Sequence, residues 1–83
     1  MKLAKFVKFR EEKFGGVLFE TRSEKVFTLN PTGAAVVREI TSGTIEADIP
    51  ERIRSRFEGD GAAIDRDVRE FLTELRARAL VED

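Results

Sequence analysis

The segment Lys25-Val-Phe-Thr-Leu-Asn-Pro-Thr-Gly33 marks the point at which the chain changes from strands to helices. Its first half, from Lys25 to Leu29, mixes β-branched, aromatic and polar residues in the manner of a strand. Asn30 and Pro31 then form a strong helix start. Asn accepts hydrogen bonds from the free amides of a first turn, and Pro loses nothing at the first helical position. The segment therefore predicts a strand that leads directly into a helix.

Before this segment the sequence predicts two more strands. Residues 5–9 mix aromatic, β-branched and lysine residues, and residues 16–21 form a second run of the same kind. We expect residues 10–13 to be a charged connector and residues 22–24 to be a short polar turn of hairpin length. The spacing predicts a three-stranded antiparallel meander in which residues 25–29 form the last strand.

After the segment, helical periodicity replaces the strand pattern. The first helix is expected to continue through residues 34–41 and to end at Ser42-Gly43, where Gly43 can take a positive φ. A second helix is predicted to begin with Asp48 as its cap, and Pro50 is tolerable within its first turn. The apolar stripe of this helix consists of Ile49, Ile53 and Phe57.

The third helix has the clearest pattern. Residues 58–61 break the second helix, Asp65 is the expected cap, and the third helix runs to about Arg78. Its apolar stripe consists of Ile64, Val68, Phe71, Leu72 and Leu75. Residues 80–81 form a short apolar tail that we expect to pack on the core. The sum is a single α+β domain over residues 1–83. It is a three-stranded antiparallel sheet followed by three helices (βββααα), in a winged helix-turn-helix-like arrangement.

The composition excludes most kinds of catalytic chemistry. The 83 residues contain no His and no Cys, so the usual nucleophilic dyads and triads, zinc fingers and disulfides have no side chains to build them. Carboxylate pairs such as Glu70 and Glu74 belong to a helix rich in Arg, where surface ion pairing is the simpler interpretation. A chain this short also has a thin core, which leaves little room for a deep substrate pocket. We therefore expect a binding protein, not an enzyme, with no metal and no cofactor.

The charge pattern bears on the choice of partner. The formal net charge is −1, but residues 1–30 carry seven basic and four acidic side chains, whereas residues 31–83 carry eight and twelve. The third helix has four Arg and four acidic residues between Asp65 and Arg78. Because DNA affinity depends on Lys and Arg that neutralise phosphates, nucleic acid is disfavoured as a partner. A minimal winged-helix DNA-binding regulator remains the alternative function.

The chain shows no sign of a membrane segment. No apolar run approaches the about 20 residues that span a bilayer, and the first residues have no signal-peptide stretch, so a cytoplasmic protein without a membrane partner is expected.

The predicted sheet has edges that could bind a partner. A small sheet has two edges, and an extended peptide can add a strand to one of them. A bare oligomerisation module that uses the same edge is a further alternative.

Several motifs, in order, resemble those of a known family. Leu29-Asn-Pro-Thr-Gly33 directly after a strand is similar to the Leu-Asn-x-Thr-Gly motif of the PqqD-like family, which comprises the RiPP precursor peptide recognition elements (RREs). The segment from Val68 to Leu75 is similar to the Phe-Leu-x-x-Leu helix of that family. In the Ala-Leu dipeptide that follows, Ala79 stands where the family usually has Gly. The Gly-Gly-Val-Leu-Phe run at residues 15–19 is also similar to a branch associated with mycofactocin biosynthesis.

The resemblance implies a non-catalytic chaperone of peptide modification. Members of the family bind the leader region of a precursor peptide as a further strand, beside the third strand and against the last helix. They present it to a modifying enzyme, often a radical S-adenosylmethionine (radical SAM) protein. A monomer or a weak sheet-edge dimer is expected. The third-strand positions that would bind the peptide are Lys25, Val26, Phe27, Thr28 and Leu29.

The positions on the last helix are chosen because one face must meet both the core and the groove. They are Val68, Arg69, Leu72, Leu75 and Arg76. The apolar ones could equally serve only the core. Arg69 and Arg76 could pair with acidic leader side chains or be plainly solvated. Asn30 and Gly33 are interpreted as architectural, as a helix cap and a point of close packing.

Overall fold

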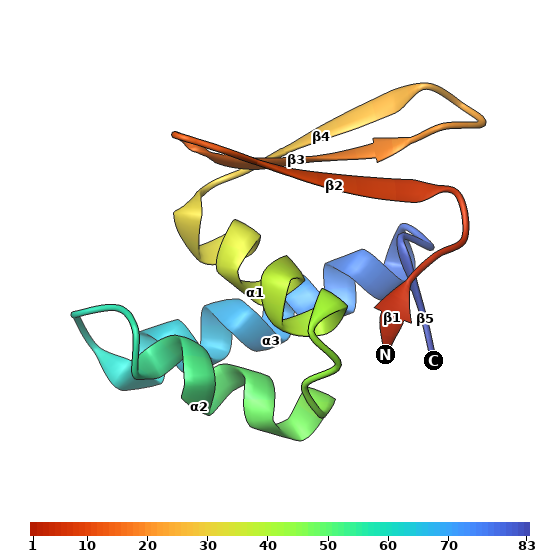
Figure 1. Cartoon of the computed structure of the whole chain (residues 1–83). Helices are drawn as coiled ribbons and strands as arrows, with labels where there is room; N and C mark the ends of the chain where they lie inside the picture. The colour runs from red at the N-terminus through yellow and green to blue at the C-terminus, as the bar shows by residue number, and fades with distance from the viewer.

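The computed structural model describes the whole chain, residues 1–83. It is a three-stranded antiparallel sheet followed by three α-helices, as predicted (Figure 1). The strands of this sheet lie in the order β2-β3-β4, and α1 lies between the sheet and the other two helices. The elements are β1 (Lys2–Leu3), β2 (Val7–Glu12), β3 (Gly15–Glu20), β4 (Lys25–Leu29), α1 (Pro31–Thr41), the 3₁₀ turn η1 (Glu46–Asp48), α2 (Ile49–Arg54), α3 (Gly61–Ala77) and β5 (Val81–Glu82).

The junction between β4 and α1 has the predicted form. Strand β4 ends at Leu29, and Asn30 caps α1 by accepting a hydrogen bond of 2.8 Å from the backbone amide of Gly33. Pro31 occupies the first helical position, where its missing N–H costs no bond. This junction fixes the direction in which the chain leaves the sheet, and it places the first turn of α1 beside the end of β4.

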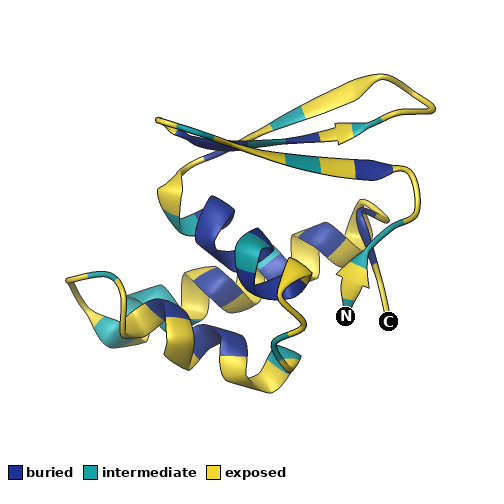
Figure 2. Cartoon of the chain, viewed as in Figure 1, coloured by how far each residue is buried: buried dark blue, intermediate teal, exposed yellow.

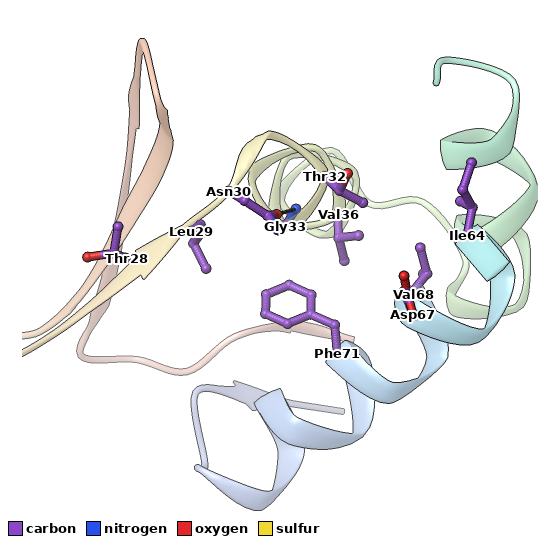
Figure 3. Close-up of a pocket in the computed structure, with 10 residues that line it drawn as sticks. All are labelled: Thr28, Leu29, Asn30, Thr32, Gly33, Val36, Ile64, Asp67, Val68 and Phe71. Carbon is purple, nitrogen blue, oxygen red and sulfur yellow. Dashed lines mark hydrogen bonds between the residues drawn. The ribbon is translucent and has the colours of Figure 1, made fainter. Parts of the chain in front are cut away.

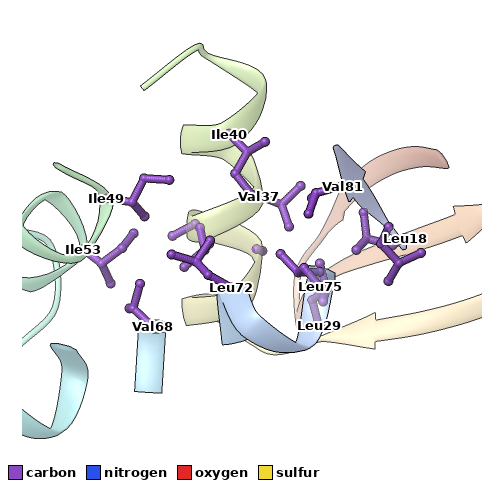
Figure 4. Close-up of a cluster of buried hydrophobic side chains, with 14 of the residues drawn as sticks. Leu18, Leu29, Val37, Ile40, Ile49, Ile53, Val68, Leu72, Leu75 and Val81 are labelled. Carbon is purple, nitrogen blue, oxygen red and sulfur yellow. The ribbon is translucent and has the colours of Figure 1, made fainter. Parts of the chain in front are cut away.

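The core lies between the sheet and the helices and among the helices themselves, and one face of β2, β3, β4 and each α-helix contributes to it (Figures 2 and 4). Leu18 at the centre of β3 is fully buried, while Phe19 beside it is exposed on the outer face. The buried apolar residues are Val7, Leu18, Leu29, Ala34, Ala35, Val36, Val37, Ile40, Ile49, Ile53, Val68, Leu72, Leu75, Leu80 and Val81. The predicted stripes of the second and third helices supply Ile49, Ile53, Val68, Leu72 and Leu75 to this core, whereas Phe57, Ile64 and Phe71 are only partly buried.

The first long strand differs from its predicted position. The expected strand covered residues 5–9 with a charged connector at 10–13, whereas β2 covers Val7–Glu12. Glu12 pairs with Gly15, so only two residues form the turn. The charged residues fit in the strand because β2 is an edge strand at the surface, where Arg10 pairs with Glu12 at 3.3 Å.

The backbone after this turn requires glycine at position 15. The φ of Gly15 is +143°, and a Cβ placed there would lie 2.1 Å from the carbonyl oxygen of Leu29. The backbone at the start of β3 therefore approaches the end of β4 more closely than any residue with a side chain would allow.

The third helix starts earlier than predicted, whereas the second starts after Asp48, as predicted, but without a capping hydrogen bond. Asp60, not Asp65, caps α3, by accepting a 2.9 Å hydrogen bond from the amide of Ala62. Asp65 lies one turn inside the helix, where it pairs with two arginines. Asp48 precedes α2 but makes no capping hydrogen bond, because it ends the 3₁₀ turn η1. Phe57 lies beyond the end of α2 and packs half-buried against the core.

The two ends of the chain form a small sheet that was not predicted. Leu3 pairs with Val81, and Lys2 with Glu82. This pairing holds Leu80 and Val81 against the core, where the apolar tail was expected to pack. No helix has the length and apolar character needed to cross a membrane.

Candidate functional site

Strand β4 is a free edge of the sheet. Thr21 donates its amide to the carbonyl of Phe6 at 2.9 Å, which extends the β2–β3 ladder by one hydrogen-bonded pair. In an antiparallel sheet successive residues alternate between the two neighbours, so Leu18 bonds towards β4, to its partner Phe27. By the same alternation the backbone groups of Val26 and Thr28 point away from β3. They are free to bond with an added strand.

The other edge of the sheet is less suited to receive a strand. Strand β2 carries four charged residues among its six, and Glu11 is engaged by Arg38 from α1. Edges that carry many charges resist pairing with another chain. Strand β4 has a single charged residue, Lys25, at its first position. The two edges therefore differ, and β4 is the one open to a peptide.

The turn before β4 is held by Glu20. Its carboxylate accepts hydrogen bonds from the hydroxyl and the amide of Ser23, at 2.5 and 2.6 Å, and from Arg22. These bonds, those of Ser23 above all, lower the pKa of Glu20 to about 2. The carboxylate is therefore ionised at any ordinary pH, and it fixes the chain where it turns into β4.

A groove runs between β4 and α3. It consists of two adjoining hollows of about 260 and 360 Å³, which share Thr28, Leu29 and Phe71. The first hollow lies at the junction with α1 (Figure 3) and is lined by Thr28, Leu29, Asn30, Thr32, Gly33, Val36, Ile64, Asp67, Val68 and Phe71. The second is lined by Leu18, Val26, Phe27, Thr28, Leu29, Phe71, Glu74, Leu75, Arg78 and Leu80. The groove therefore follows the free edge of the strand.

The floor of the groove is apolar and its rim is charged. Leu29 from β4 and Phe71 from α3 point toward one another across it (Figure 3). At the far end the guanidinium of Arg78 lies 5.3 Å from the centre of the Phe27 ring, and its Nε lies 3.0 Å from Glu74. A strand added to β4 would thus find backbone partners along one side and an apolar surface beneath it.

The structure brings some of the expected site residues to this groove. Val26, Phe27, Thr28 and Leu29 line it, and Lys25 lies exposed at the start of β4. Val68 and Leu75 line it too, although each is also almost completely buried in the core.

Arg69, Leu72 and Arg76 lie elsewhere, on the flank of α3 that faces η1 and the start of α2. Arg76 donates to Glu46 at 2.6 Å and to Asp83 at 3.0 Å, and these bonds raise the pKa of its guanidinium. The same pairing lowers the pKa of Glu46. Arg76 therefore links α3 to η1 and to the C-terminal end of the chain, whereas Arg69 pairs with Asp65 of its own helix.

Five residues of α3 and its C-terminal end that line the groove were absent from the expected set. They are Ile64, Asp67, Phe71, Glu74 and Arg78. Their spacing of three, four and seven residues puts them on one face of the helix. Sequence periodicity found the apolar members of that face but assigned them to the core. It had no means to tell the side facing β4 from the side facing α2.

A buried ion cluster lies outside the groove. Glu39 of α1 is 2% exposed, and its carboxylate accepts hydrogen bonds of 2.6 Å from both Thr44 and Arg52. Arg56 approaches the other oxygen to 3.1 Å. The hydroxyl of Thr44 and the two guanidinium groups lower the pKa of Glu39 in spite of its burial. No group of three or more His, Cys, Asp or Glu side chains is placed to hold a metal ion.

Taken together, the sheet, the three helices and the groove define a small α+β domain of the winged helix-turn-helix type, with an open edge strand beside its last helix. The sequence pattern of the PqqD family, described as coenzyme PQQ synthesis protein D, matches residues 15–81. The chain belongs to the PqqD family.

Solved structures share this fold. TbiB1 in complex with the TbiA(beta) leader peptide is 24% identical, with a TM-score of 0.84 over 99% of this chain and 95% of that one. A lasso peptide synthetase B1 complexed with the leader peptide is also 24% identical, with a TM-score of 0.81 over 99% and 96%. SuiB of Streptococcus suis bound to S-adenosylmethionine is 16% identical, with a TM-score of 0.50 over 92% of this chain and 23% of SuiB. A comparison with curated proteins gave no match.

Proposed function

We propose that this protein binds the leader region of a ribosomally made precursor peptide and presents it to a modifying enzyme. The leader adds as a strand to β4 and lies in the groove against α3. The observation that carries this proposal is the combination of the unpaired backbone of Val26 and Thr28 with the apolar groove alongside it. Main-chain hydrogen bonds supply affinity in such complexes, and the pockets beside the strand supply specificity.

Family membership and the structural neighbours support the same function. Two neighbours that match this chain over nearly their whole length were solved with a leader peptide bound. The match to part of SuiB shows the same fold within a longer chain that binds S-adenosylmethionine. An enzyme that uses S-adenosylmethionine is therefore the partner we favour. The domain itself is not expected to be catalytic, since the groove contains only Asp67, Glu74 and Arg78 as ionisable groups, and none of them is a base placed to activate a hydroxyl.

DNA binding finds less support in the structure. Arg69, Arg76 and Arg78, in α3 and at its end, are all engaged by carboxylates within 3.0 Å, so the helix presents few free cations to phosphates. A second copy of the chain could occupy the β4 edge as a weak dimer. The leader would then compete with that copy, and a monomer would be the form that binds it.

The substitution Val26→Pro tests the proposal at the edge of the strand. Proline removes the outward N–H of Val26, which faces away from β3, and such a position tolerates proline in an edge strand. We expect the affinity for a leader peptide that binds this chain to fall at least about tenfold, because a main-chain hydrogen bond is lost and the strand edge is blocked. Fluorescence anisotropy with the labelled leader measures this change.

Val26→Ala is the matched control, because Val26 is 59% exposed and contributes little to the core. The alanine variant retains the N–H and should bind within about threefold of the original chain. Equal binding by the proline variant, with its fold intact by circular dichroism, would refute strand addition at β4.

A further inference from the structure

The first hollow of the groove has one charged residue in its lining. That residue is Asp67 on the second turn of α3, and the other nine lining residues are apolar or neutral. Asp67 sits at the rim, with its side chain 63% exposed. Its carboxylate therefore borders the space that a peptide side chain would enter from the end of β4.

Asp67 differs from the other carboxylates near it in having no strong partner. Asp65, two residues earlier, is held by Arg54 at 2.6 Å and by Arg69 at 2.7 Å, and these bonds lower its pKa. Glu74, at the other end of the groove, is matched by Arg78 at 3.0 Å. The cation paired with Asp67 is its neighbour Arg66, 3.6 Å away with both side chains mostly exposed. The groove therefore has an unbalanced negative charge at the Asp67 end, whereas the charges at the Glu74 end are paired.

The first turn of α1 offsets this negative charge only in part. A helix N-terminus attracts anions through its free amides. Here Pro31 has no N–H and the amide of Gly33 is already bonded to Asn30, which leaves the amide of Thr32 in this turn. An acidic peptide side chain would thus face Asp67 with little to compensate it.

We propose that Asp67 determines specificity by selecting leader peptides with a lysine or arginine on the helix-facing side of the added strand, opposite the C-terminal end of β4. This inference rests on the proposed function and extends it to the chemistry of the peptide. An exposed ion pair of this kind favours a basic over a neutral side chain by about two- to fivefold. Salt reduces that preference, because it screens charges at a surface.

The experiment uses a displayed library of random peptides of about 12 residues, long enough to pair with β4 and extend beyond it. Selections are run against the original chain, Asp67→Asn, Asp67→Lys and Glu70→Gln. Glu70 is the matched control, because it is an exposed acid of the same helix that does not line the groove. Each selected peptide is then compared with its Lys→Gln counterpart by fluorescence anisotropy at low and high salt.

We expect basic residues to be enriched at one position with the original chain and with Glu70→Gln. The enrichment should disappear with Asp67→Asn and change to acidic residues with Asp67→Lys. NMR chemical shifts of the protein amides show where each selected peptide binds. Peptides that change the amide shifts of β4 but show the same charge preference in all four proteins would overturn this inference and leave the proposed function intact. Selected peptides that leave the amides of β4 unchanged would overturn both.

Discussion

At the scale of single residues, Ala79 shows how the backbone explains a departure from the family. Ala79 has a φ of +58°, a region that residues other than Gly enter at a cost. It follows the end of α3, where its own amide bonds to the carbonyl of Arg76 and the amide of Leu80 bonds to that of Leu75, both at 3.0 Å. This is a Schellman ending, in which Gly is the usual residue. The family's preference for Gly at this position has this physical cause.

The substitution Ala79→Gly should therefore stabilise the protein. Removing the methyl group relieves the strained φ, and we expect the free energy of unfolding to rise by about 1 kcal/mol. Urea denaturation followed by circular dichroism measures the change. Ala77→Gly, inside the last turn of α3, is the control and should lower the stability by about 0.5–1 kcal/mol. A loss of stability in the Ala79 variant would show that the positive φ is not a source of strain.

At the scale of elements, the ion cluster around Glu39 joins α1 to α2. Glu39 belongs to α1, Thr44 to the connection, and Arg52 and Arg56 to α2 and the residues after it. Because the pKa of Glu39 is lower in the folded protein than its ordinary 4.5, the carboxylate stabilises the fold above that pH. This contribution is lost as the pH falls through the lowered folded pKa.

The variant Glu39→Gln tests the cluster through its dependence on pH. Near pH 7 we expect it to be less stable than the original chain by about 1–3 kcal/mol, since one partner of a buried charged pair is removed. Below pH 4.5 the difference should shrink, because the unfolded chain then takes up a proton at Glu39, and it should vanish once the pH falls below the lowered pKa of the folded protein. Urea denaturation at several pH values measures both. A difference that stays constant down to about pH 2 would show that the charge of Glu39 does not contribute.

The elements also show which features could be predicted from the sequence. The β4–α1 junction was predicted correctly because its signals, Asn30 and Pro31, are local. The predicted start of α3 was wrong because Asp60 and Asp65 are equally good capping residues by sequence. Only the backbone conformation shows that Asp60 is the cap. The pairing of β1 with β5 joins opposite ends of the chain, and strands of two residues have no periodicity to detect.

For the candidate site, the sequence pointed to β4 but not to the groove face of α3. Periodicity identifies an apolar stripe, yet on α3 that stripe faces two ways. Leu72 packs toward α2 and η1, whereas Phe71, its neighbour, faces β4. Arg69 and Arg76 lie on the same side as Leu72, away from the groove. Only the packing of three elements around α3 resolves the two sides.

At the scale of the whole molecule, the division of charge along the sequence becomes a division in space. The sheet belongs to the basic half of the chain, and the helices below it belong to the acidic half (Figure 1). The groove lies where the two halves meet, with Lys25 at the start of one wall and Asp67 on the other. Binding a peptide in this groove needs a free strand edge and a helix beside it, and the fold provides both.

The central claim is that a leader peptide adds as a strand to β4, and amide NMR of the ¹⁵N-labelled protein tests it most directly. On saturation with a leader peptide that binds this chain, we predict large chemical shift changes for the amides of Val26 and Thr28 and slower hydrogen exchange of those amides. The amides of Phe9 and Glu11, which by the same alternation point outward from the opposite edge, should remain unchanged. A bound leader that shifts the β2 edge or the Arg69–Arg76 flank, and leaves β4 unaffected, would contradict strand addition at β4.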